Sequence, residues 1–263
     1  MANNQEIRVF GLKRSGNHAI INWLFQQITG KVVFLNNCYP AGKKLNLYTG
    51  KGRIDCKGIN YWDFKQRRFF FDKNPFAGRE IISYSKKDER FQSEKLKSTL
   101  KSAVIISFEN KDINQMSTLL DQNHDQLVGK SQKIFAIIIL RDPFNMLASI
   151  YHKWGEKNLR KAAFQWTDYA KKFLEIDDNS SHSWLGISYN RWVVEESYRR
   201  EIVEKLQIPF DDSAKNIVTN FGGGSSFENL SYSGNADKMR IFERFKIYEK
   251  DEKFRSVVQN QEL

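Results

Sequence analysis

Residues 6–18, EIRVFGLKRSGNH, join a short apolar segment to a glycine-bounded loop and then to a helical pattern. Residues 6–12 have the composition of a buried strand, and residues 19–28 repeat apolar side chains at helical spacing. A strand, a glycine turn and a helix are the opening of a βαβ unit. This stretch therefore predicts an α/β fold.

The loop in this stretch is bounded by Gly11 and Gly16. Backbone N–H groups in such a turn converge with the N-terminus of the following helix, and both favour an anion. Lys13 and Arg14 add positive charge, and Ser15 adds a hydroxyl. The loop predicts a binding site for phosphate or a similar group, with an ordinary glycine turn as the alternative.

The end of the loop differs from that of nucleotide-hydrolysing enzymes. A P-loop continues Gly-Lys-Ser/Thr, where the lysine contacts the β- and γ-phosphates and the hydroxyl binds Mg²⁺. Asn17 and His18 stand at those two positions here. The sequence keeps the anion cradle and lacks the magnesium ligand, which predicts a phosphate-like group bound without metal.

A second anion pocket is indicated after residues 134–140, an unbroken apolar run typical of a central strand in a parallel sheet. Arg141 follows this run, at the edge where α/β sheets bind ligands. Ser149 lies eight residues further on, in a helix predicted over 144–154 that Pro143 favours at its first turn. A guanidinium and a hydroxyl placed in this way can hold a second anionic group.

Strands and helices alternate along the rest of the chain, without a repeat or a low-complexity linker. Further strands are expected at 81–84 and 103–108, and further helices at 88–101, 113–127, 159–174, 193–206 and 236–258. We expect one domain over residues 1–263, a three-layer α/β/α fold with a central, mostly parallel sheet and a P-loop-like architecture. Residues 36–76, with prolines and glycines among lysines and aromatics, predict an irregular insertion.

The formal charge of +11 and the pI of about 9.5 predict attraction to anions without identifying one. No apolar stretch has the length of a secretory signal or a membrane span, so we expect a cytoplasmic protein without a transmembrane segment.

Cys38 and Cys56 are expected to be free thiols, although one disulfide between them is the alternative. The histidines lack metal-ligand spacing, so no metal site is expected, and the oligomeric state is left open.

The two anion segments together resemble those of the sulfotransferases that use PAPS (3′-phosphoadenosine 5′-phosphosulfate). Residues 13–18, KRSGNH, resemble the loop that holds the 5′-phosphosulfate, and residues 140–151, LRDPFNMLASIY, resemble the 3′-phosphate motif. The resemblance assigns Arg14 to the sulfuryl group and assigns Arg141 and Ser149 to the 3′-phosphate. The other loop residues that it implies for donor binding are Lys13, Ser15, Gly16, Asn17 and His18.

Two aromatic residues extend the resemblance. Tyr189 and Phe227, the latter in the segment SSF at 225–227, are similar to aromatics that contact adenine in the family, with core packing as the alternative for each. Residues 244–246, RFK, resemble a basic segment that closes over the nucleotide. The sequence departs from the family where Asn17 and His18 replace two usual threonines, and a glycine-rich basic motif near the end is not recognisable.

The resemblance implies an enzyme that moves a sulfuryl group from PAPS to a hydroxyl or amine and releases PAP, the desulfated product, without a metal. A small molecule or a carbohydrate is the expected acceptor. Arg14 would stabilise charge in the transition state. Glu109, directly after the strand at 103–108, is the expected general base, with a surface carboxylate as the alternative; His18 is a second candidate.

Two other functions stay open at this point. Interleaved lysines and aromatics at 43–73 would suit a non-catalytic basic module that binds nucleotides or nucleic acid. A P-loop kinase-like enzyme is the other, weakened by Asn17 and His18. Two anion motifs at two strand ends are not explained by nucleic-acid binding, so nucleic acid is the less favoured partner.

Overall fold

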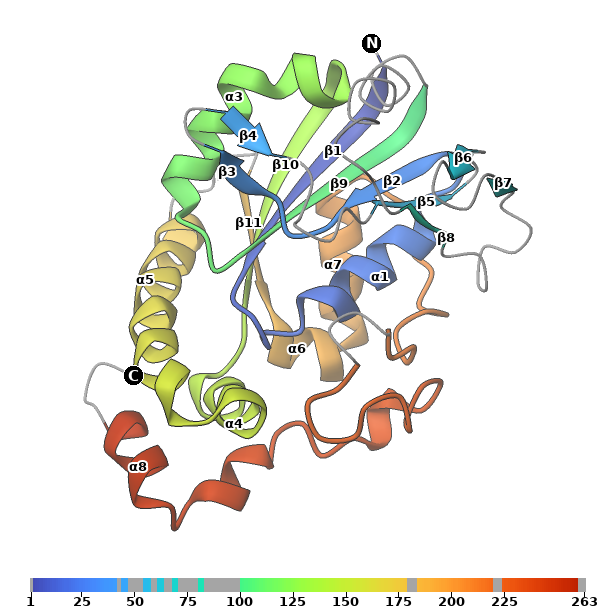
Figure 1. Cartoon of the computed structure of the whole chain (residues 1–263). Coiled ribbons are helices and arrows are strands. Elements are labelled where there is room, and N and C mark those ends of the chain that lie inside the picture. The colour runs from blue at the N-terminus through green and yellow to red at the C-terminus, as the bar shows by residue number, and fades with distance from the viewer. Residues whose placement is uncertain are drawn as a thin grey trace. The chain divides into compact units, whose positions relative to one another are not determined.

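A computed structural model describes residues 2–41, 44–46, 54–57, 61–63, 68–70, 80–82, 100–178, 184–219 and 224–259 (Figure 1). Its side chains are described over residues 2–38, 100–120, 128–176, 184–219 and 224–259. The chain divides into two compact units. Unit 1 comprises Met1–Phe10 and Ile28–Ala136, and unit 2 comprises Gly11–Gln27 and Ile137–Leu263.

Unit 1 is built on a sheet whose strands follow the order β10-β1-β9-β2-β5-β8 (Figure 1). Strand β2 pairs in parallel with β9, with Val32 opposite Ala103, and β5 pairs antiparallel with both β2 and β8. The strands of this sheet are β1 (Asn3–Gly11), β2 (Val32–Leu35), β5 (Ile54–Lys57), β8 (Glu80–Ile82), β9 (Lys101–Glu109) and β10 (Ser131–Leu140).

Two short hairpins and one helix complete the described part of unit 1. The hairpins are β3 (Tyr39–Ala41) with β4 (Lys44–Asn46), and β6 (Tyr61–Asp63) with β7 (Arg68–Phe70). Helix α3 (Ile113–Val128) begins after Asp112, whose carboxylate accepts a hydrogen bond from the N–H of Gln115 at 2.7 Å. A cap of this kind satisfies a helix donor that has no partner within the helix.

Strand β1 is buried along nearly its whole length although it carries two charges. Arg8 Nε donates to Glu6 Oε1 at 2.8 Å, and Ser131 Oγ donates to Glu6 Oε2 at 3.1 Å. Both charged side chains are almost inaccessible to water. A buried charge is tolerated when it is paired and hydrogen-bonded, which is why this polar sequence can still form an interior strand.

Unit 2 is mainly helical. Strand β10 continues into it from Ile137, and β11 lies beside β10. Its elements are α1 (Asn17–Gln27), α4 (Pro143–Trp154), η1 (Glu156–Asn158), α5 (Leu159–Asp178), β11 (Trp184–Ser188), α6 (Tyr189–Val194), α7 (Glu196–Lys205), η3 (Ala236–Lys238), η4 (Arg244–Tyr248) and α8 (Glu252–Val258). The C-terminal segment with η4 and α8 runs along α4 (Figure 1).

Most predicted elements are confirmed to within a few residues. These are the strands expected at 6–12, 103–108 and 134–140 and the helices expected at 19–28, 113–127, 144–154 and 159–174. Strands β2 and β11 are additional. The strand expected at 81–84 overlaps β8, and most of the helix expected at 88–101 lies outside the described residues. Within 36–76 the structure describes residues 36–38 and the five strands β3 to β7, and the rest of that insertion lies outside the described residues.

The helix predicted over 193–206 corresponds to α7 and is wrong only at its start, because a break at Glu195 separates α6 from α7. Glu195 has an extended conformation, with φ −105° and ψ 109°. The carbonyl of Trp192 accepts a hydrogen bond from Arg199 Nη1 at 2.8 Å. A guanidinium therefore takes a carbonyl that a continuous helix would have used for its own ladder.

The helix predicted over 236–258 is also wrong. Only α8 is α-helical there, preceded by the short 3₁₀ segments η3 and η4. Between them, the carbonyl of Ile241 accepts from Arg141 Nη2 at 2.6 Å and the carbonyl of Phe242 accepts from Asn145 Nδ2 at 3.2 Å. These carbonyls bond to side chains of the α4 region, so the local helical periodicity does not become a helix.

Two further expectations can be compared with the described residues. Cys38 is a buried thiol, and burial raises its pKa, while the side chain of Cys56 lies outside the described residues. In the part of the chain that the structure describes, the helices are too short or too polar to cross a membrane.

Asp212 connects α1 to α7 within unit 2. Its carboxylate accepts hydrogen bonds from Arg199, at 2.9 Å from Nε and 2.7 Å from Nη2, and from Trp23 Nε1 at 3.0 Å. Arg199 and Trp23 are buried, whereas the Asp212 side chain is 26% exposed. One carboxylate therefore satisfies a buried cation and a buried indole donor together.

Replacing Asp212 by alanine is expected to lower the free energy of unfolding by about 2–4 kcal/mol, since it leaves the buried Arg199 guanidinium without its counter-ion. Urea denaturation followed by circular dichroism measures the change. Glu196→Ala is the matched control, because Glu196 pairs with Arg200 on the surface of α7 and exposed pairs contribute little. Equal losses in the two variants would show that the buried pair has no special role.

Candidate functional site

The glycine loop of unit 2 is a tight turn closed by its own hydrogen bonds. The N–H of Ser15 donates to the carbonyl of Leu12 at 3.1 Å, and Asn17 Nδ2 donates to the same carbonyl at 3.0 Å. Arg14 and Gly16 have left-handed backbones, with φ of 68° and 86°. A non-glycine residue in this conformation carries strain, and such strain is concentrated at functional sites.

Both glycines of the loop are required by close contacts. A Cβ at Gly11 would lie 2.1 Å from Asn17 Oδ1, and a Cβ at Gly16 would lie 2.1 Å from the ring of Tyr189. Tyr189 is therefore packed directly on the loop, and the guanidinium of Arg141 lies 5.2 Å from the centre of its ring. The structure brings this predicted residue to the site, and its contact with adenine stays a prediction.

Asn17 and Ser15 are buried, and their side chains brace the loop. The Asn17 amide bonds to Leu12, and Ser15 Oγ lies 3.3 Å from the sulfur of Met146 on α4. The amide that replaces a usual threonine thus stabilises the turn. His18 follows in the first turn of α1 and is partly exposed.

The two cations of the loop lie over one indole. Lys13 Nζ is 5.9 Å and the Arg14 guanidinium 5.1 Å from the ring centre of Trp154, at the end of α4. Arg14 Nη1 also donates to the carbonyl of Gly224 at 3.4 Å. A cation over an aromatic face is attracted by the ring quadrupole, so Trp154 helps to hold both charges at the loop. Sequence reasoning missed this residue, whose only signal is its place at the end of the helix predicted over 144–154.

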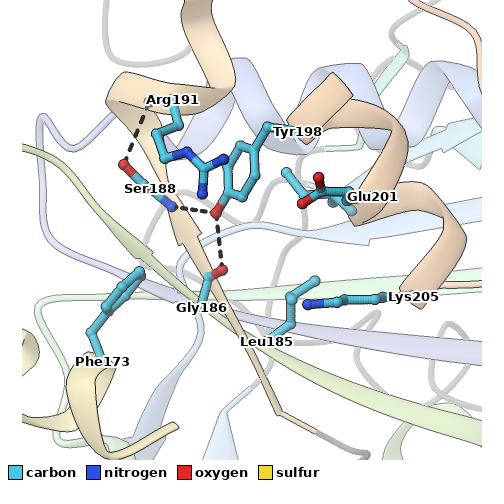
Figure 2. Close-up of a pocket in the computed structure, with 9 residues that line it drawn as sticks. Phe173, Leu185, Gly186, Ser188, Arg191, Tyr198, Glu201 and Lys205 are labelled. Carbon is cyan, nitrogen blue, oxygen red and sulfur yellow. Dashed lines mark hydrogen bonds between the residues drawn. The ribbon is translucent and has the colours of Figure 1, made fainter. Parts of the chain in front are cut away.

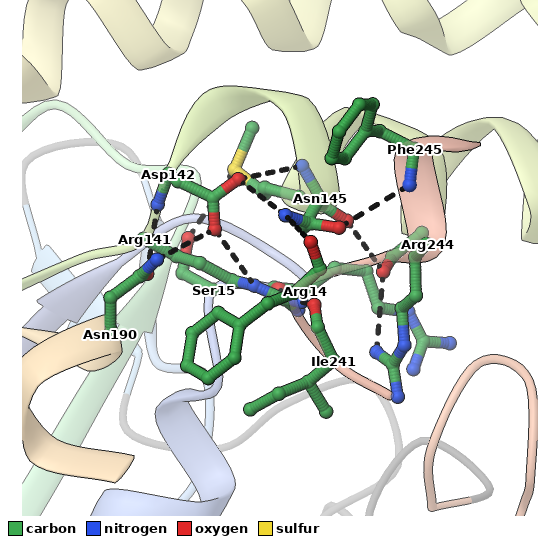
Figure 3. Close-up of polar contacts among 12 residues, drawn as sticks. Arg14, Ser15, Arg141, Asp142, Asn145, Asn190, Ile241, Arg244 and Phe245 are labelled. Carbon is green, nitrogen blue, oxygen red and sulfur yellow. Dashed lines mark hydrogen bonds and ion pairs between the residues drawn. The ribbon is translucent and has the colours of Figure 1, made fainter. Parts of the chain in front are cut away.

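Arg141 lies at the carboxyl end of β10 with only 3% of its surface exposed (Figure 3). Its Nη1 donates to the carbonyl of Arg14 at 3.3 Å and its Nη2 donates to that of Ile241. Its Nε–H has no hydrogen-bond partner within the part of the chain that the structure describes. Burial lowers the pKa of the guanidinium below its ordinary value, which means that the charged form is poorly solvated here.

Ser149 is completely buried on α4, and the cation that touches it is Arg244. Arg244 Nη1 donates to Ser149 Oγ at 3.4 Å, and Ser149 Oγ donates to the carbonyl of Asn145 at 2.8 Å. The charge of Arg244 also lowers the pKa of Arg141. The predicted pair of Arg141 and Ser149 is thus part of a group of three, in which Arg244 is the additional member.

Arg244 is itself 6% exposed and has a limited set of partners. Its Nη2 donates to Ser225 Oγ at 2.8 Å and to Glu228 Oε2 at 2.9 Å, whereas its Nε–H has no partner among the described residues. The only sequence signal for Arg244 is the loose resemblance of residues 244–246 to a basic segment over the nucleotide.

Phe227 is packed against the same arginine. The guanidinium of Arg244 lies 5.0 Å from its ring centre, and the ring of His152 stacks on it with centroids 4.1 Å apart. His152 Nδ1 is 2.7 Å from the hydroxyl of Tyr248. The structure therefore places Phe227 beside the 3′-phosphate candidates, and its contact with adenine stays a prediction.

Asp142 fixes the position of Arg141 and the start of α4 (Figure 3). Its Oδ1 accepts from the N–H of Asn145 at 2.8 Å, and its Oδ2 accepts from Asn190 Nδ2 at 3.0 Å. Asn190 Oδ1 in return accepts the N–H of Asp142 at 3.2 Å, and Trp166 Nε1 donates to the carbonyl of Arg141 at 2.7 Å. The strand end, α4 and α6 are joined by one carboxylate, so the guanidinium has a defined direction.

A separate cavity of about 240 Å³ lies where β11 turns into α6 (Figure 2). The hydroxyl of Tyr198 accepts from the N–H of Ser188 at 3.0 Å and donates to the carbonyl of Gly186 at 3.2 Å. Ser188 Oγ caps α6 by accepting from the N–H of Arg191. None of the predicted site residues lines this cavity. The two hydrogen bonds of Tyr198 hold the end of β11, which directly precedes Tyr189.

Glu109 ends β9 in unit 1, and its N–H donates to Asn37 Oδ1 at 3.3 Å. All the other predicted site residues belong to unit 2. The role of Glu109 as a base stays a prediction. Among the side chains that the structure describes, no three His, Cys, Asp or Glu residues gather as a metal site would require.

Gly16→Ala is expected to destabilise the protein more than Gly155→Ala. Both glycines have left-handed φ, 86° and 69°, but only at Gly16 would the new Cβ overlap the Tyr189 ring, since nothing lies within 4 Å at Gly155. We expect a loss of about 1 kcal/mol for Gly155→Ala and about 3 kcal/mol for Gly16→Ala.

Thermal and urea unfolding of the two variants measure the difference. Adding Tyr189→Ala to Gly16→Ala should recover part of the loss by removing the overlap. Equal stabilities for Gly16→Ala and Gly155→Ala would contradict the close packing of Tyr189 on the loop.

The geometry can be compared with known proteins. No family model and no curated protein matches the chain. Among solved structures, the chain is similar to the mouse sulfotransferase SULT7A1 complexed with PAP, with a TM-score of 0.53 and 11% sequence identity over 97% of this chain and 82% of that one.

Two further solved structures match with lower TM-scores. One is the sulfotransferase domain of the Synechococcus PCC 7002 olefin synthase, with a TM-score of 0.44 and 10% identity over 93% of this chain and 94% of that one. The other is a sulfotransferase domain from the curacin biosynthetic pathway, with values of 0.42 and 12% over 96% and 95%. The likeness to the mouse structure confirms the predicted α/β fold with a central, mostly parallel sheet flanked by helices, and the chain has the sulfotransferase fold.

Proposed function

We propose that this protein is a PAPS-dependent sulfotransferase that transfers a sulfuryl group to a hydroxyl or amine of a small molecule or carbohydrate. One observation carries the proposal. Two guanidinium groups are buried near the glycine loop: Arg141 bonds to the carbonyl of Arg14, Arg244 bonds to Ser149, and the Nε–H of each has no hydrogen-bond partner in the described chain. Buried donors without partners are costly, and an anion would satisfy them.

The arrangement of donors fits a ligand with two separated anionic groups. The loop presents backbone N–H groups and the N-terminus of α1 together with Lys13 and Arg14. The arginine pair forms a second cationic position, tied to the loop by the bond from Arg141 to the carbonyl of Arg14. PAPS has a 5′-phosphosulfate and a 3′-phosphate, and the similar mouse enzyme was solved with PAP.

The chain's own residues would act mainly by position and charge. The bound donor supplies a sulfuryl group whose transfer, like phosphoryl transfer, depends on positioning and on stabilising charge at the leaving oxygen. Arg14 is held by Gly224 and Trp154 and supplies a fixed positive charge at the loop. Removing one such donor from a preorganised site typically lowers turnover about 10²- to 10³-fold.

An acceptor hydroxyl must also lose a proton. We propose Glu109 as the general base on its position after a central strand, and His18, in the first turn of α1, as the second candidate. A base must come within hydrogen-bond reach of the proton that it removes. Glu109 belongs to unit 1 and His18 to unit 2. Replacing each in turn can therefore show which of the two is needed for turnover.

PAP is expected to raise the melting temperature of the protein in EDTA, and ATP-Mg²⁺ is expected to raise it less. A ligand at 100 times its Kd adds about 2.7 kcal/mol to the free energy of unfolding, enough for a clear thermal shift. Arg141→Ala and Ser149→Ala should each abolish the PAP shift, because both remove groups at the second anion position.

Arg240→Ala is the control, since Arg240 is 80% exposed and pairs with Glu243 on the surface. Stabilisation by ATP-Mg²⁺ without stabilisation by PAP would refute the proposal and favour a kinase-like enzyme. Strong binding of oligonucleotides with no PAP shift would favour a nucleic-acid-binding module.

Glu109→Gln is expected to keep the PAP shift and to remove most turnover with labelled PAPS and an accepted acceptor. The amide has the same shape but cannot accept the acceptor's proton. His18→Gln is the companion variant. Full activity of Glu109→Gln together with an inactive His18→Gln would assign the base to His18.

A further inference from the structure

The turn formed by residues 224–229 supplies groups to two of the arginines. The N–H of Ser225 donates to the carbonyl of Asn229 at 2.9 Å, which closes the turn. Gly224, with φ of 81°, presents its carbonyl to Arg14 Nη1 at 3.4 Å. The turn thus has its own internal order and also reaches the candidate site.

Glu228 in this turn directs its carboxylate at the second anion position. Its Oε2 accepts from Arg244 Nη2 at 2.9 Å and from the hydroxyl of Ser225. Arg244 Nη1 donates to Ser149 Oγ at the same time. One guanidinium therefore joins the Glu228 carboxylate to the serine that the family resemblance assigns to the 3′-phosphate.

The charges show that this carboxylate is a shared counter-ion. Arg141 and Arg244 are both more than nine-tenths buried, and the positive charge of Arg244 adds to burial in lowering the pKa of Arg141. The negative charge of Glu228 acts in the opposite sense on Arg141. Asp142, whose Oδ2 lies 3.8 Å from Arg141 Nε, also raises the pKa of Arg141, whereas the carboxylate that hydrogen-bonds to Arg244 is Glu228.

A single carboxylate is a poor substitute for a phosphate at this position. It has two oxygens and one charge, and the Nε–H groups of the two arginines remain without hydrogen-bond partners in the described chain. A phosphate monoester has three terminal oxygens and a charge between about −1.5 and −2 at neutral pH. It can therefore satisfy both guanidinium groups more fully than Glu228 does.

We infer that Glu228 is a specificity residue whose carboxylate takes the place of the donor's 3′-phosphate in the ligand-free protein and is displaced when a 3′-phosphorylated nucleotide binds. This inference rests on the proposed function. A nucleotide with a free 3′-hydroxyl brings no charge to Arg244 and leaves the Glu228 pair in place. Displacing Glu228 from Arg244 therefore costs binding free energy, and only a nucleotide with a 3′-phosphate can offset that cost.

The opposite role for Glu228 gives the opposite result. If the carboxylate instead held Arg244 in position for the phosphate, its removal would weaken binding of the 3′-phosphorylated ligand. The sign of the change in affinity therefore separates displacement from support.

Isothermal titration calorimetry with PAP and with adenosine 5′-phosphate tests the inference, because these two ligands differ only in the 3′-phosphate. Glu228→Gln keeps the size of the side chain and its ability to bond to Ser225, and it removes the charge. We expect its Kd for PAP to fall about tenfold, since close charge pairs contribute at least that much in interfaces. Its Kd for adenosine 5′-phosphate should change less than about twofold.

Thermal unfolding supplies a second test, because the substitution that strengthens PAP binding should lower the melting temperature of the ligand-free protein. Without ligand, Glu228→Gln should melt below the wild type because the buried Arg244 loses its counter-ion, and its PAP-induced shift should be larger. Glu228→Asp, with a shorter side chain, should lie between the two and serves if the glutamine variant does not fold. Glu243→Gln is the matched control, a carboxylate paired with the exposed Arg240.

The outcomes distinguish the two proposals. A wild-type protein that does not bind PAP would refute the proposed function and the inference with it. A wild-type protein that binds PAP, with an equal or higher Kd for PAP in Glu228→Gln, would overturn the displacement role of Glu228 and leave the proposed function standing.

Discussion

The buried positive charge of Arg141 is the constraint on which the rest of unit 2 depends. At 3% exposure the guanidinium has almost no water, so its donors must bond to the protein. Two of them bond to the carbonyls of Arg14 and Ile241, which come from opposite ends of the chain. The strained backbone of the loop and the non-helical path before η4 can both be understood as ways of presenting a carbonyl to this one cation.

The parts of the structure that the sequence predicted correctly are those whose conformation is determined by neighbouring residues in the chain. The apolar run of β10, the glycine loop before α1 and the proline at the start of α4 each specify their own conformation, whatever lies around them. Arg14, Arg141 and Ser149 are found because each sits at a fixed distance from such an element. The strand–loop–helix order was therefore enough to predict the fold class and most of the candidate site.

The parts that it missed depend on contacts between distant residues. Residues 236–258 have a helical pattern, but the carbonyls that a helix needs at Ile241 and Phe242 bond to side chains about a hundred positions away. The break at Glu195 has the same origin, since Arg199 takes the carbonyl of Trp192. In both cases a buried polar side chain competes with the helix ladder for main-chain acceptors. The sequence offered only a loose resemblance for Arg244, and its bond to Ser149 became visible only when this path was known.

On the proposed function, these competing demands would explain why buried cations are kept at the candidate site at a cost in stability. Arg141 and Arg244 are both buried, and the charge of Arg244 lowers the pKa of Arg141, so the ligand-free protein holds two cations that disfavour one another. An anion that binds there would reduce the repulsion between the buried guanidinium groups. The free energy gained in this way would contribute to the affinity for the anion. Substitutions that add carboxylates would stabilise the fold and weaken anion binding together, which is the usual opposition between stability and function at a preorganised site.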